Sequence, residues 1–245
     1  MSTILITGAN RGIGLELVRQ YAGLGWKVLA TARDPAGATE LVALARADPK
    51  IIIEKLDVTD HAGVDALALK LKDQPLDVLL SNAGKTPRYT SAMQGAGTID
   101  YEQALNSYKV NALGPAKLVS AFLPLVQKSG QKKIAVISSK AGSFVEGPPM
   151  SMMYEYRASK AALNMIVHTL GFETAKMGVV IAAISPGSVA TRPVEGELGY
   201  GTNTRQAYTI SPAESVAAII QVIASLTPDQ NGAFLDYKDG RVIPW

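Results

Sequence analysis

Short apolar runs alternate with longer amphipathic segments along the whole chain. Seven runs are rich in aliphatic residues, and most are apolar throughout, which is typical of parallel strands covered on both faces. The predicted strands are Thr3–Thr7, Lys27–Ala32, Ile51–Lys55, Val78–Ser81, Ile134–Ser138, Val179–Ser185 and Ala233–Asp236. The predicted helices are Gly12–Leu24, Ala36–Ala47, Ala62–Lys72, Tyr101–Gln127, Tyr156–Lys176 and Pro212–Ser225.

This alternation predicts an α/β fold, a doubly wound parallel sheet of about seven strands with helices on both faces. A length of 245 residues, 47% of them hydrophobic, and no visible linker favour one domain over residues 1–245. Three connections are unusually long: Gly84–Thr98, Ala141–Met153 and Arg192–Ile210. If the preceding strands share a direction, all three loops emerge at the carboxyl edge of the sheet, where such folds place ligands.

The composition limits the binding partners and the cellular location that we expect. The net charge of +3 is spread along the chain, so no basic stripe indicates binding to nucleic acid or to an anionic membrane. Cysteine is absent, which excludes disulfides, thiolate metal sites and cysteine nucleophiles and fits a reducing compartment. The chain starts directly with a strand, and no apolar run reaches about 18 residues. We therefore expect a cytoplasmic protein without signal peptide or membrane span.

A glycine turn follows the first predicted strand. The segment TGANRGIG carries Gly8, Gly12 and Gly14 and leads into a helix. Glycines let a backbone approach a pyrophosphate, and a helix N-terminus offers unpaired N–H groups and a positive dipole end. The spacing G-x3-G-x-G differs from the commoner G-x-G-x-x-G and is a weak signal alone. Because it opens a βαβ unit, it predicts a dinucleotide site.

The end of the second strand bears on the type of dinucleotide. A ribose-binding acid is expected about 20 residues after the glycines, but Ala32 occupies that place and Arg33 follows it. A guanidinium suits a 2′-phosphate because its planar donors can bind two oxygens, and Arg11 adds a second positive charge. These residues favour NADP. Asp34 leaves NAD open, because a shift of one residue would make it the ribose acid.

A candidate proton-transfer group lies between Ile134 and Lys160. Tyr156 and Lys160 are four residues apart and share one helix face, while Ser139 ends the preceding strand. Strand alternation points Ser138 the other way, and Tyr154 has no lysine four residues later. With nine tyrosines in the chain, a Tyr-x3-Lys pair is expected by chance about half the time, so the pair needs support from other residues.

Several motifs in a fixed order supply that support, and with them the chain resembles the short-chain dehydrogenases/reductases. The motifs are the glycine turn, Ser81-Asn82-Ala83-Gly84, Asn111, Ser139, Tyr156-x3-Lys160 and Pro186-Gly187-x3-Thr191. The resemblance covers nearly the whole chain. Through YRASKAALNM and SSKAGS, it is strongest to carbonyl reductases of the Sniffer and C-factor type.

The resemblance implies a role for each motif. Residues of the glycine turn would hold the pyrophosphate and adenosine ribose: Gly8, Asn10, Arg11, Gly12, Ile13 and Gly14. Asp57 and Val58 would meet the adenine. The ribose would be lined by Asn82, Ala83 and Gly84. The nicotinamide would be covered by Pro186, Gly187, Val189 and Thr191.

The catalytic group implied by the family is Asn111, Ser139, Tyr156 and Lys160. A free phenol has a pKa of about 10, and a nearby ammonium lowers it, so Lys160 would prepare Tyr156 as general acid/base. Ser139 would hydrogen-bond the carbonyl oxygen as charge develops there, and Asn111 would hold a water near Lys160. The implied activity is NADPH-dependent reduction of a ketone, aldehyde or quinone. An NAD-dependent secondary-alcohol dehydrogenase and a cofactor-binding signalling relative of C-factor type are the alternatives.

Other chemistries are disfavoured. The chain has two histidines, His61 and His168, and neither G-x-S-x-G nor G-x4-G-K-[ST], so we expect no Ser-His-Asp hydrolase, no NTPase and no metal site.

The long loops should select the small-molecule substrate. Apolar, adaptable residues favour a hydrophobic carbonyl: Phe144, Met150, Met152, Met153 and Tyr200. Arg88, Arg192 and Arg205 keep an anionic substrate open. We expect loop 141–153, stiffened by Pro148–Pro149, to form part of the pocket wall. Family members commonly pair through the long helices that here start near Asn111 and Tyr156, so a homo-oligomer is expected.

Overall fold

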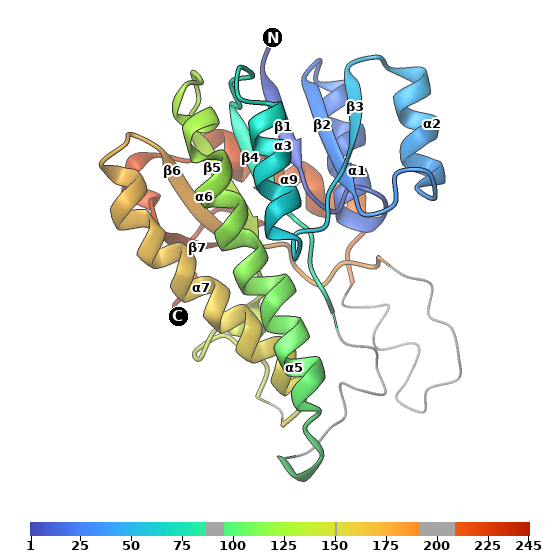
Figure 1. Cartoon of the computed structure of the whole chain (residues 1–245). Coiled ribbons are helices and arrows are strands. Elements are labelled where there is room, and N and C mark those ends of the chain that lie inside the picture. Colours follow the sequence, from blue (N-terminus) through green and yellow to red (C-terminus); the bar gives the residue numbers. More distant parts are fainter. Residues whose placement is uncertain (87–95, 150, 192–208) are drawn as a thin grey trace.

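The computed structural model describes residues 1–86, 96–149, 151–191 and 209–245. Seven strands form one sheet in the order β3-β2-β1-β4-β5-β6-β7, and every neighbouring pair is parallel (Figure 1). The strands are β1 Thr3–Ile6, β2 Lys27–Ala32, β3 Ile51–Lys55, β4 Val78–Ser81, β5 Lys133–Ile137, β6 Val180–Ser185 and β7 Ala233–Asp236. The prediction of a seven-stranded, doubly wound parallel sheet is confirmed.

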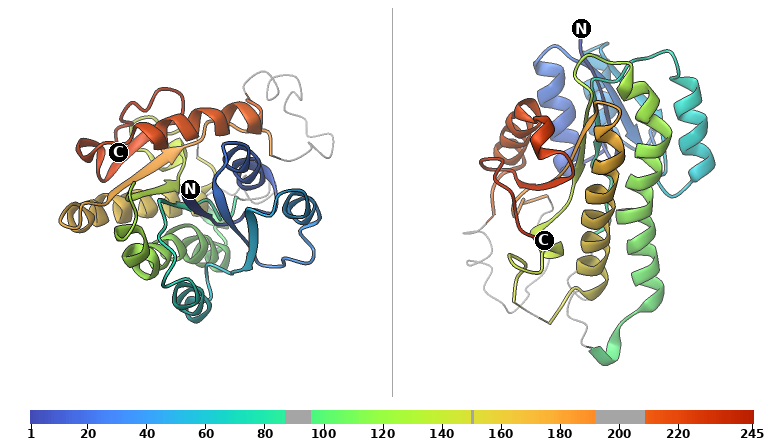
Figure 2. Two further views of the ribbon diagram at one scale, coloured as in Figure 1. Left: turned by 90° about the horizontal axis from the view of Figure 1, so that it is seen from above. Right: turned by 90° about the vertical axis from the view of Figure 1, so that its left-hand side faces the viewer.

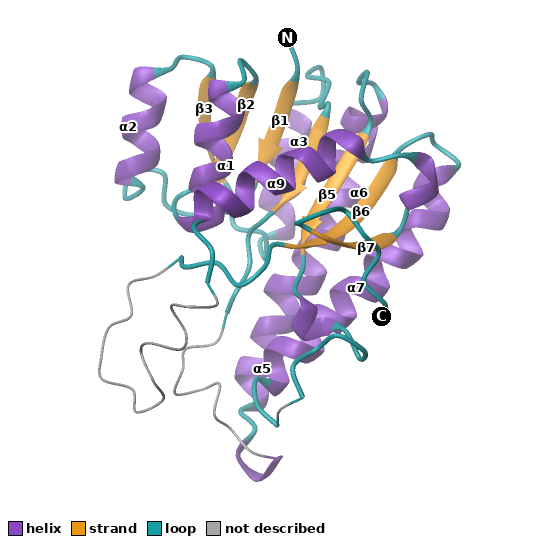
Figure 3. Ribbon diagram, turned by 180° about the vertical axis from the view of Figure 1, so that it is seen from behind, coloured by secondary structure: helices purple, strands orange, loops and turns teal. Residues whose placement is uncertain are grey.

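Helices cover both faces of the sheet, as Figures 2 and 3 show. The helices are α1 Gly12–Gly23, α2 Thr39–Ala47, α3 His61–Lys70, α5 Tyr101–Tyr108, α6 Gly114–Gln127, α7 Tyr154–Ala175 and α9 Pro212–Ser225. One apolar core lies under α1, α2 and α9, and the other lies under α3, α6 and α7. Alternate residues of β1 divide between these cores, since Ile4 and Ile6 belong to the first and Leu5 to the second. This division explains why the strands are apolar throughout.

The order in which strands are added to the sheet reverses beside β1. The chain first builds outward from β1 to β2 and β3, then returns to add β4 on the other side of β1. The two connections after β1 and β4 therefore diverge at the carboxyl edge and leave a crevice between them, which is where open α/β sheets bind ligands. The glycine turn and Asn82 lie on these two connections.

The predicted helix Tyr101–Gln127 is correct in extent but is not a continuous α-helix. Between α5 and α6 the structure has one π-helical turn, η2, at Lys109–Leu113. The cause is visible in the sequence. Pro115 has no N–H to donate to the carbonyl of Asn111 four residues earlier, and the N–H of Gly114 donates to Lys109, five residues earlier. Asn111 thus lies at the centre of the irregular turn.

Smaller differences concern element ends. β5 begins and ends one residue earlier than predicted, so Ser138 and Ser139 both follow the strand. α7 begins at Tyr154 rather than Tyr156, after Met153 in a left-handed conformation with φ of 59°. Tyr156 and Lys160 consequently both lie inside the helix rather than Tyr156 at its start. None of the helices in the described part of the chain combines the length and apolarity needed to cross a membrane.

The C-terminal segment closes the β7 edge of the sheet. Val242 forms an antiparallel bridge with Leu235, and the Ile243 N–H donates to Phe234 O at 2.7 Å. The Tyr237 N–H donates to Ser185 O at 3.0 Å, which ties this segment to the end of β6. After β7 the chain therefore turns back and runs antiparallel beside that strand.

Candidate active site

The glycine turn allows the backbones of two segments to approach each other closely. A Cβ on Gly8, whose φ is +66°, would lie 2.8 Å from Ala83 Cα. A Cβ on Gly14 would lie 2.1 Å from Gly8 O, which no side chain tolerates. Glycine is required at both positions because the turn after β1 packs directly on the turn after β4.

Thr7 and Asn82 fasten these two turns together. Thr7 Oγ1 accepts hydrogen bonds from the backbone N–H groups of Asn82 and Ala83, both at 3.0 Å. Asn82 Nδ2 donates to Thr7 O at 3.0 Å and to Gly8 O at 3.1 Å. The crevice at the switch point is therefore held by partly buried hydrogen bonds. Arg11 precedes α1 in extended conformation and its side chain makes no capping hydrogen bond to the first N–H groups of that helix.

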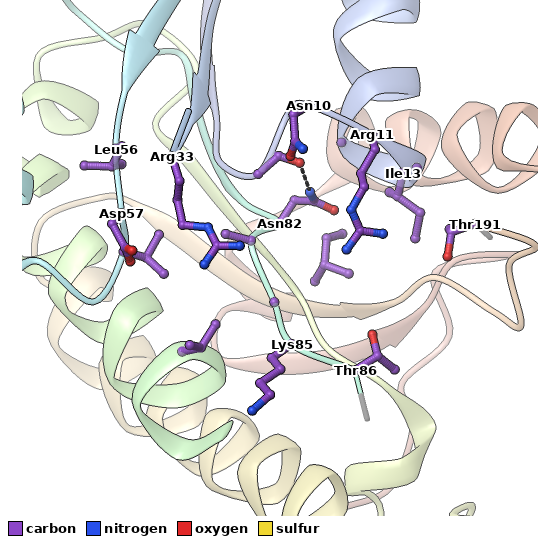
Figure 4. A pocket seen from close by; sticks show the side chains of 18 of the residues that line it. Asn10, Arg11, Ile13, Arg33, Leu56, Asp57, Asn82, Lys85, Thr86 and Thr191 are labelled. Atoms are coloured by element: carbon purple, nitrogen blue, oxygen red, sulfur yellow. Dashed lines mark hydrogen bonds between the residues drawn. The ribbon is translucent and has the colours of Figure 1, made fainter. Parts of the chain in front are cut away.

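A cavity of about 820 Å³ opens along this crevice (Figure 4). It is lined by most of the predicted cofactor-binding residues: Gly8, Asn10, Arg11, Gly12, Ile13, Gly14, Arg33, Asp57, Val58, Asn82, Ala83, Gly84, Tyr156, Lys160, Pro186 and Thr191. Thr191 reaches across to α1, where its Cβ lies 3.2 Å from a Cβ built on Gly12. One elongated space thus connects the end of β2 with Tyr156 and Lys160.

Positive and negative groups meet at the β2 end of the cavity. Arg11 and Arg33 extend into the same space from different segments (Figure 4). Asp34 also lines the cavity, but its Oδ1 accepts the Gly37 N–H at 3.1 Å within its own turn. Burial raises the pKa of the Asp57 carboxyl, but hydrogen bonds from Thr59 and the charge of Arg33 outweigh it, so the pKa lies below its usual value. An anion at this end would meet two guanidinium groups.

The other end of the cavity holds the predicted proton-transfer group. Burial raises the pKa of the Tyr156 phenol, and a hydrogen bond with Ser139 opposes that rise. Lys160 Nζ lies 5.9 Å from the centre of the Tyr156 ring. The structure therefore brings the three side chains together, from the end of β5 and from one face of α7.

Lys160 is 5% exposed, and its Nζ donates to Ile137 O at 2.9 Å. Burial lowers its pKa to about 8. This ammonium can release its proton far more readily than an exposed lysine does. It also lies close to Asn111, because a Cβ on Gly84 would be 3.4 Å from Asn111 Oδ1 and 3.9 Å from Lys160 Nζ.

Asn111 is fully buried in the π-helical turn. Its side chain pairs with the backbone of Lys85 in both directions, accepting from the N–H at 2.7 Å and donating to the carbonyl at 2.9 Å. Nδ2 also donates to Ser159 Oγ at 2.9 Å. Asn111 thus holds the start of the loop after β4 against α7, beside Lys160.

Four predicted residues are near the cavity but outside its lining, namely Asn111, Ser139, Gly187 and Val189. Gly187 packs under the Tyr237 ring, and Val189 forms an isolated bridge with Ile210. Other lining residues were absent from our predicted site: Asp34, Gly37, Leu56, Lys85, Thr86, Asn106, Val110, Ile137 and Ser138. Most of these carry no motif of their own, and only their position beside predicted residues could have indicated them.

Comparison with known proteins identifies the family. The family model for short chain dehydrogenases matches residues 2–197, most of the chain. The chain is a short-chain dehydrogenase/reductase.

Solved structures resemble this short-chain dehydrogenase/reductase over its whole length. A carbonyl reductase from chicken fatty liver, solved with NADPH bound, is 32% identical with a TM-score of 0.85, covering 100% of this chain and 99% of that one. The carbonyl reductase Sniffer of D. melanogaster is 30% identical with a TM-score of 0.87 and full coverage of both chains. An uncharacterized oxidoreductase of Schizosaccharomyces pombe is 33% identical, covering 98% of this chain and 96% of that protein. The predicted resemblance to the Sniffer type is confirmed.

The loops predicted to select the substrate of this short-chain dehydrogenase/reductase are described only in part. Arg88, Met150, Arg192, Tyr200 and Arg205 lie outside the described residues. No described residue of loop 141–153 lines the cavity, and Phe144 is instead 89% exposed. Within the described residues, no three His, Asp or Glu side chains gather where they could hold a metal ion.

Proposed function

We propose that this protein is an NADPH-dependent carbonyl reductase that converts a ketone, aldehyde or quinone to an alcohol. The observation that carries the proposal is the single cavity joining two functional ends. One end offers the guanidinium groups of Arg11 and Arg33, and the other offers Tyr156 and Lys160 beside Ser139. A cofactor with a phosphate at one end and a reacting ring at the other fits this arrangement.

The glycine turn fits a dinucleotide because Gly8, Gly12 and Gly14 line the cavity and present backbone without side chains. The pyrophosphate would bind at the start of α1, where N–H groups and the helix dipole favour an anion. Asp57 and Val58 would contact the adenine, and Pro186 and Thr191 the nicotinamide end. When bound, NADPH supplies the hydride for the carbonyl carbon.

NADP is favoured over NAD by two observations. Arg33 extends into the cavity, whereas the competing Asp34 uses one carboxylate oxygen to bond Gly37 in its own turn. The similar chicken carbonyl reductase was solved with NADPH. An Arg side chain gives a 2′-phosphate two parallel donors, which a ribose hydroxyl does not need.

The side chains would divide the proton chemistry between them. Tyr156 would give its phenolic proton to the substrate oxygen, and Ser139 would donate a hydrogen bond to the same oxygen as its charge grows. Lys160, while protonated, would favour the phenolate and so ease this transfer. Asn111 would hold a water near Lys160 through which Tyr156 is reprotonated.

The substrate would be a hydrophobic carbonyl compound accommodated by the loops around the Tyr156 end. The predicted homo-oligomer and the predicted cytoplasmic location stay predictions. The main competing function is a cofactor-binding signalling protein with little turnover. The presence of Ser139, Tyr156 and Lys160 in one group favours the enzyme, because cofactor binding alone does not need a general acid.

The decisive experiment follows NADPH absorbance with a panel of aromatic aldehydes, ketones and quinones. We expect turnover by the wild type and a loss of at least about 100-fold in kcat for Tyr156→Phe, with NADPH still bound. Tyr154→Phe is the matched control, since it removes a phenol two residues away and should keep activity. Normal NADPH binding without turnover of any carbonyl would refute the reductase and favour the signalling alternative.

A further inference from the structure

The segment that carries Ser139 is hydrogen-bonded to α7 on both sides of that serine. Ser138 Oγ donates to Asn164 Oδ1 at 2.5 Å. Asn164 Nδ2 reaches the carbonyl of Gly142 at 3.5 Å. Asn164 therefore connects the residue before Ser139 with the short helix η3, Lys140–Gly142, that follows it.

The Ser138–Asn164 pair is buried, with each residue 2% exposed. An apolar pair of the same shape would fill this space at little or no cost in stability, whereas a buried polar pair fixes the geometry of the groups it joins. Asn164 lies one helical turn beyond Lys160, on the same face of α7. The pair is therefore continuous with the face that carries the catalytic candidates.

Close packing of η3 on α7 is a further contact between this helix and the segment that carries Ser139. A Cβ on Gly142 would lie 2.7 Å from the carbonyl carbon of Lys160 and 2.8 Å from Ala161 N. Lys160 Nζ in turn donates to Ile137 O, just before Ser138. Helix α7 thus contacts the chain at 137, 138 and 142, and Ser139 lies between these points.

We propose that Asn164 and Ser138 are positioning residues that hold the Ser139 hydroxyl in place beside Tyr156. The catalytic part of this inference rests on the proposed reductase function. Ser139 has extended backbone, and its Oγ already accepts the Ala141 N–H at 3.2 Å, so the hydroxyl hydrogen is directed away from its own turn. A hydrogen bond that strengthens in the transition state requires this donor to be placed within about 0.5 Å. Asn164 adds a second connection between this segment and α7, beside the hydrogen bond between Ser139 and Tyr156.

The test uses Ser138→Ala, Asn164→Leu and the double variant, with Ser129→Ala as control. Ser129 is also a buried serine, donating to Val126 O at 2.8 Å, but it precedes β5 at the far end of the strand. Each single variant should lose stability because it leaves a buried partner unpaired, and the double variant should recover part of that loss. The kcat of the double variant should nevertheless stay about tenfold below that of the wild type, because Ser139 is misplaced. Ser129→Ala should keep kcat within about twofold, since its hydrogen bonds do not reach the site.

A cycle with Ser139→Ala separates positioning from general weakening. If Ser138 acts through Ser139, adding Ser138→Ala to Ser139→Ala should change kcat by less than about twofold. The affinity for NADPH should stay constant in Asn164→Leu and in Ser129→Ala, because neither residue lines the cavity. A double variant with wild-type kcat, an undiminished effect of Ser138→Ala in the Ser139→Ala background, or an equal loss in Ser129→Ala would each overturn the proposal.

A readout that needs no turnover distinguishes this proposal from the proposed function. The Cζ carbon-13 signal of Tyr156, assigned with Tyr156→Phe, reports the hydrogen bond at the phenol. It should move toward the Ser139→Ala value in Ser138→Ala and in Asn164→Leu, and stay at the wild-type value in Ser129→Ala. If no carbonyl is reduced but the signal moves, the reductase fails and the positioning role stands. An unmoved signal overturns the positioning role whether or not the wild type is active.

Discussion

At the scale of single residues, the site depends on side chains whose burial alters their chemistry. Lys160 is the clearest case, because it is buried and its Nζ donates a hydrogen bond to a main-chain carbonyl. Its pKa of about 8 puts its titration within reach of experiment. Arg33, by contrast, is exposed, and its proposed role depends on the direction of its side chain, which extends into the cavity.

Lys160 should make stability depend on pH. The folded protein loses this proton near pH 8, whereas the unfolded lysine keeps it up to about 10.5. Between these values the unfolded chain binds more protons, so the free energy of unfolding should rise with pH. Urea denaturation without cofactor should show this rise in wild type, and Lys160→Met should lack it. The exposed Lys72→Met controls for loss of a positive charge, and an identical pH profile for wild type and Lys160→Met would contradict the prediction.

Arg33 should decide between the two dinucleotides. Arg33→Ala removes donors for a 2′-phosphate, so the Kd of NADPH should rise by about tenfold or more while that of NADH changes little. Titration of cofactor fluorescence measures both. Arg46→Ala, an exposed arginine at the end of α2, is the control. Unchanged NADPH affinity in Arg33→Ala would show that the phosphate binds elsewhere.

At the scale of elements, short irregular pieces place the catalytic candidates on the regular scaffold. The π-helical turn η2 holds Asn111, and η3 holds Ser139 at its start. Each irregular piece packs on α7, through Asn111 and Ser159 in one case and through Gly142 in the other. Helix α7 therefore contacts both irregular pieces that carry the catalytic candidates Asn111 and Ser139.

Gly142→Ala tests the contact between η3 and α7. The new methyl would meet the α7 backbone at less than 3 Å, so η3 must shift, and we expect a loss of about 1–3 kcal/mol in stability with a lower kcat. Gly23→Ala adds a methyl with no atom within 4 Å at the end of α1 and should leave stability equal or slightly higher. Thermal denaturation and NADPH consumption measure both variants. Equal stability and equal kcat in the two variants would mean that η3 can shift without affecting either quantity.

At the scale of the whole molecule, the C-terminal segment braces the loop that follows Ser139. Arg241 binds Glu146 through two hydrogen bonds of 2.6 and 2.8 Å, and Lys140 bridges Glu146 and Asp236. Ser143 Oγ donates to Pro244 O at 2.6 Å. Residues about 100 positions apart thus hold one side of the site together.

Arg241→Ala should loosen this loop. The amides of Val145 and Glu146, which bond Ser143 Oγ at 3.2 and 2.9 Å, should exchange hydrogen faster, while NADPH affinity stays unchanged. Arg241 lowers the pKa of Glu146 to about 2, so in wild type the brace should weaken only as pH falls below about 4.5 toward 2. Hydrogen exchange by mass spectrometry measures both effects. Lys238→Ala on the same segment is the control, and unchanged exchange in Arg241→Ala would argue against a brace.

The pattern of residues along the chain was enough to predict the alternation of strands and helices, the glycine turn and the order of the motifs. These are local properties, because apolar periodicity and glycine positions follow from burial and backbone sterics near each residue. From their spacing it also predicted Ser139 rather than Ser138 and Tyr156 rather than Tyr154, and this choice stays a prediction. The order of the motifs was therefore enough to predict the family.

How these pieces meet follows from the folded structure. The burial of Lys160 against Ile137 O and the Ser138–Asn164 pair both depend on contacts between segments distant in the chain. The physical reason is that hydrogen-bond partners and desolvation are set by packing, and packing between distant segments leaves no periodic trace in the sequence.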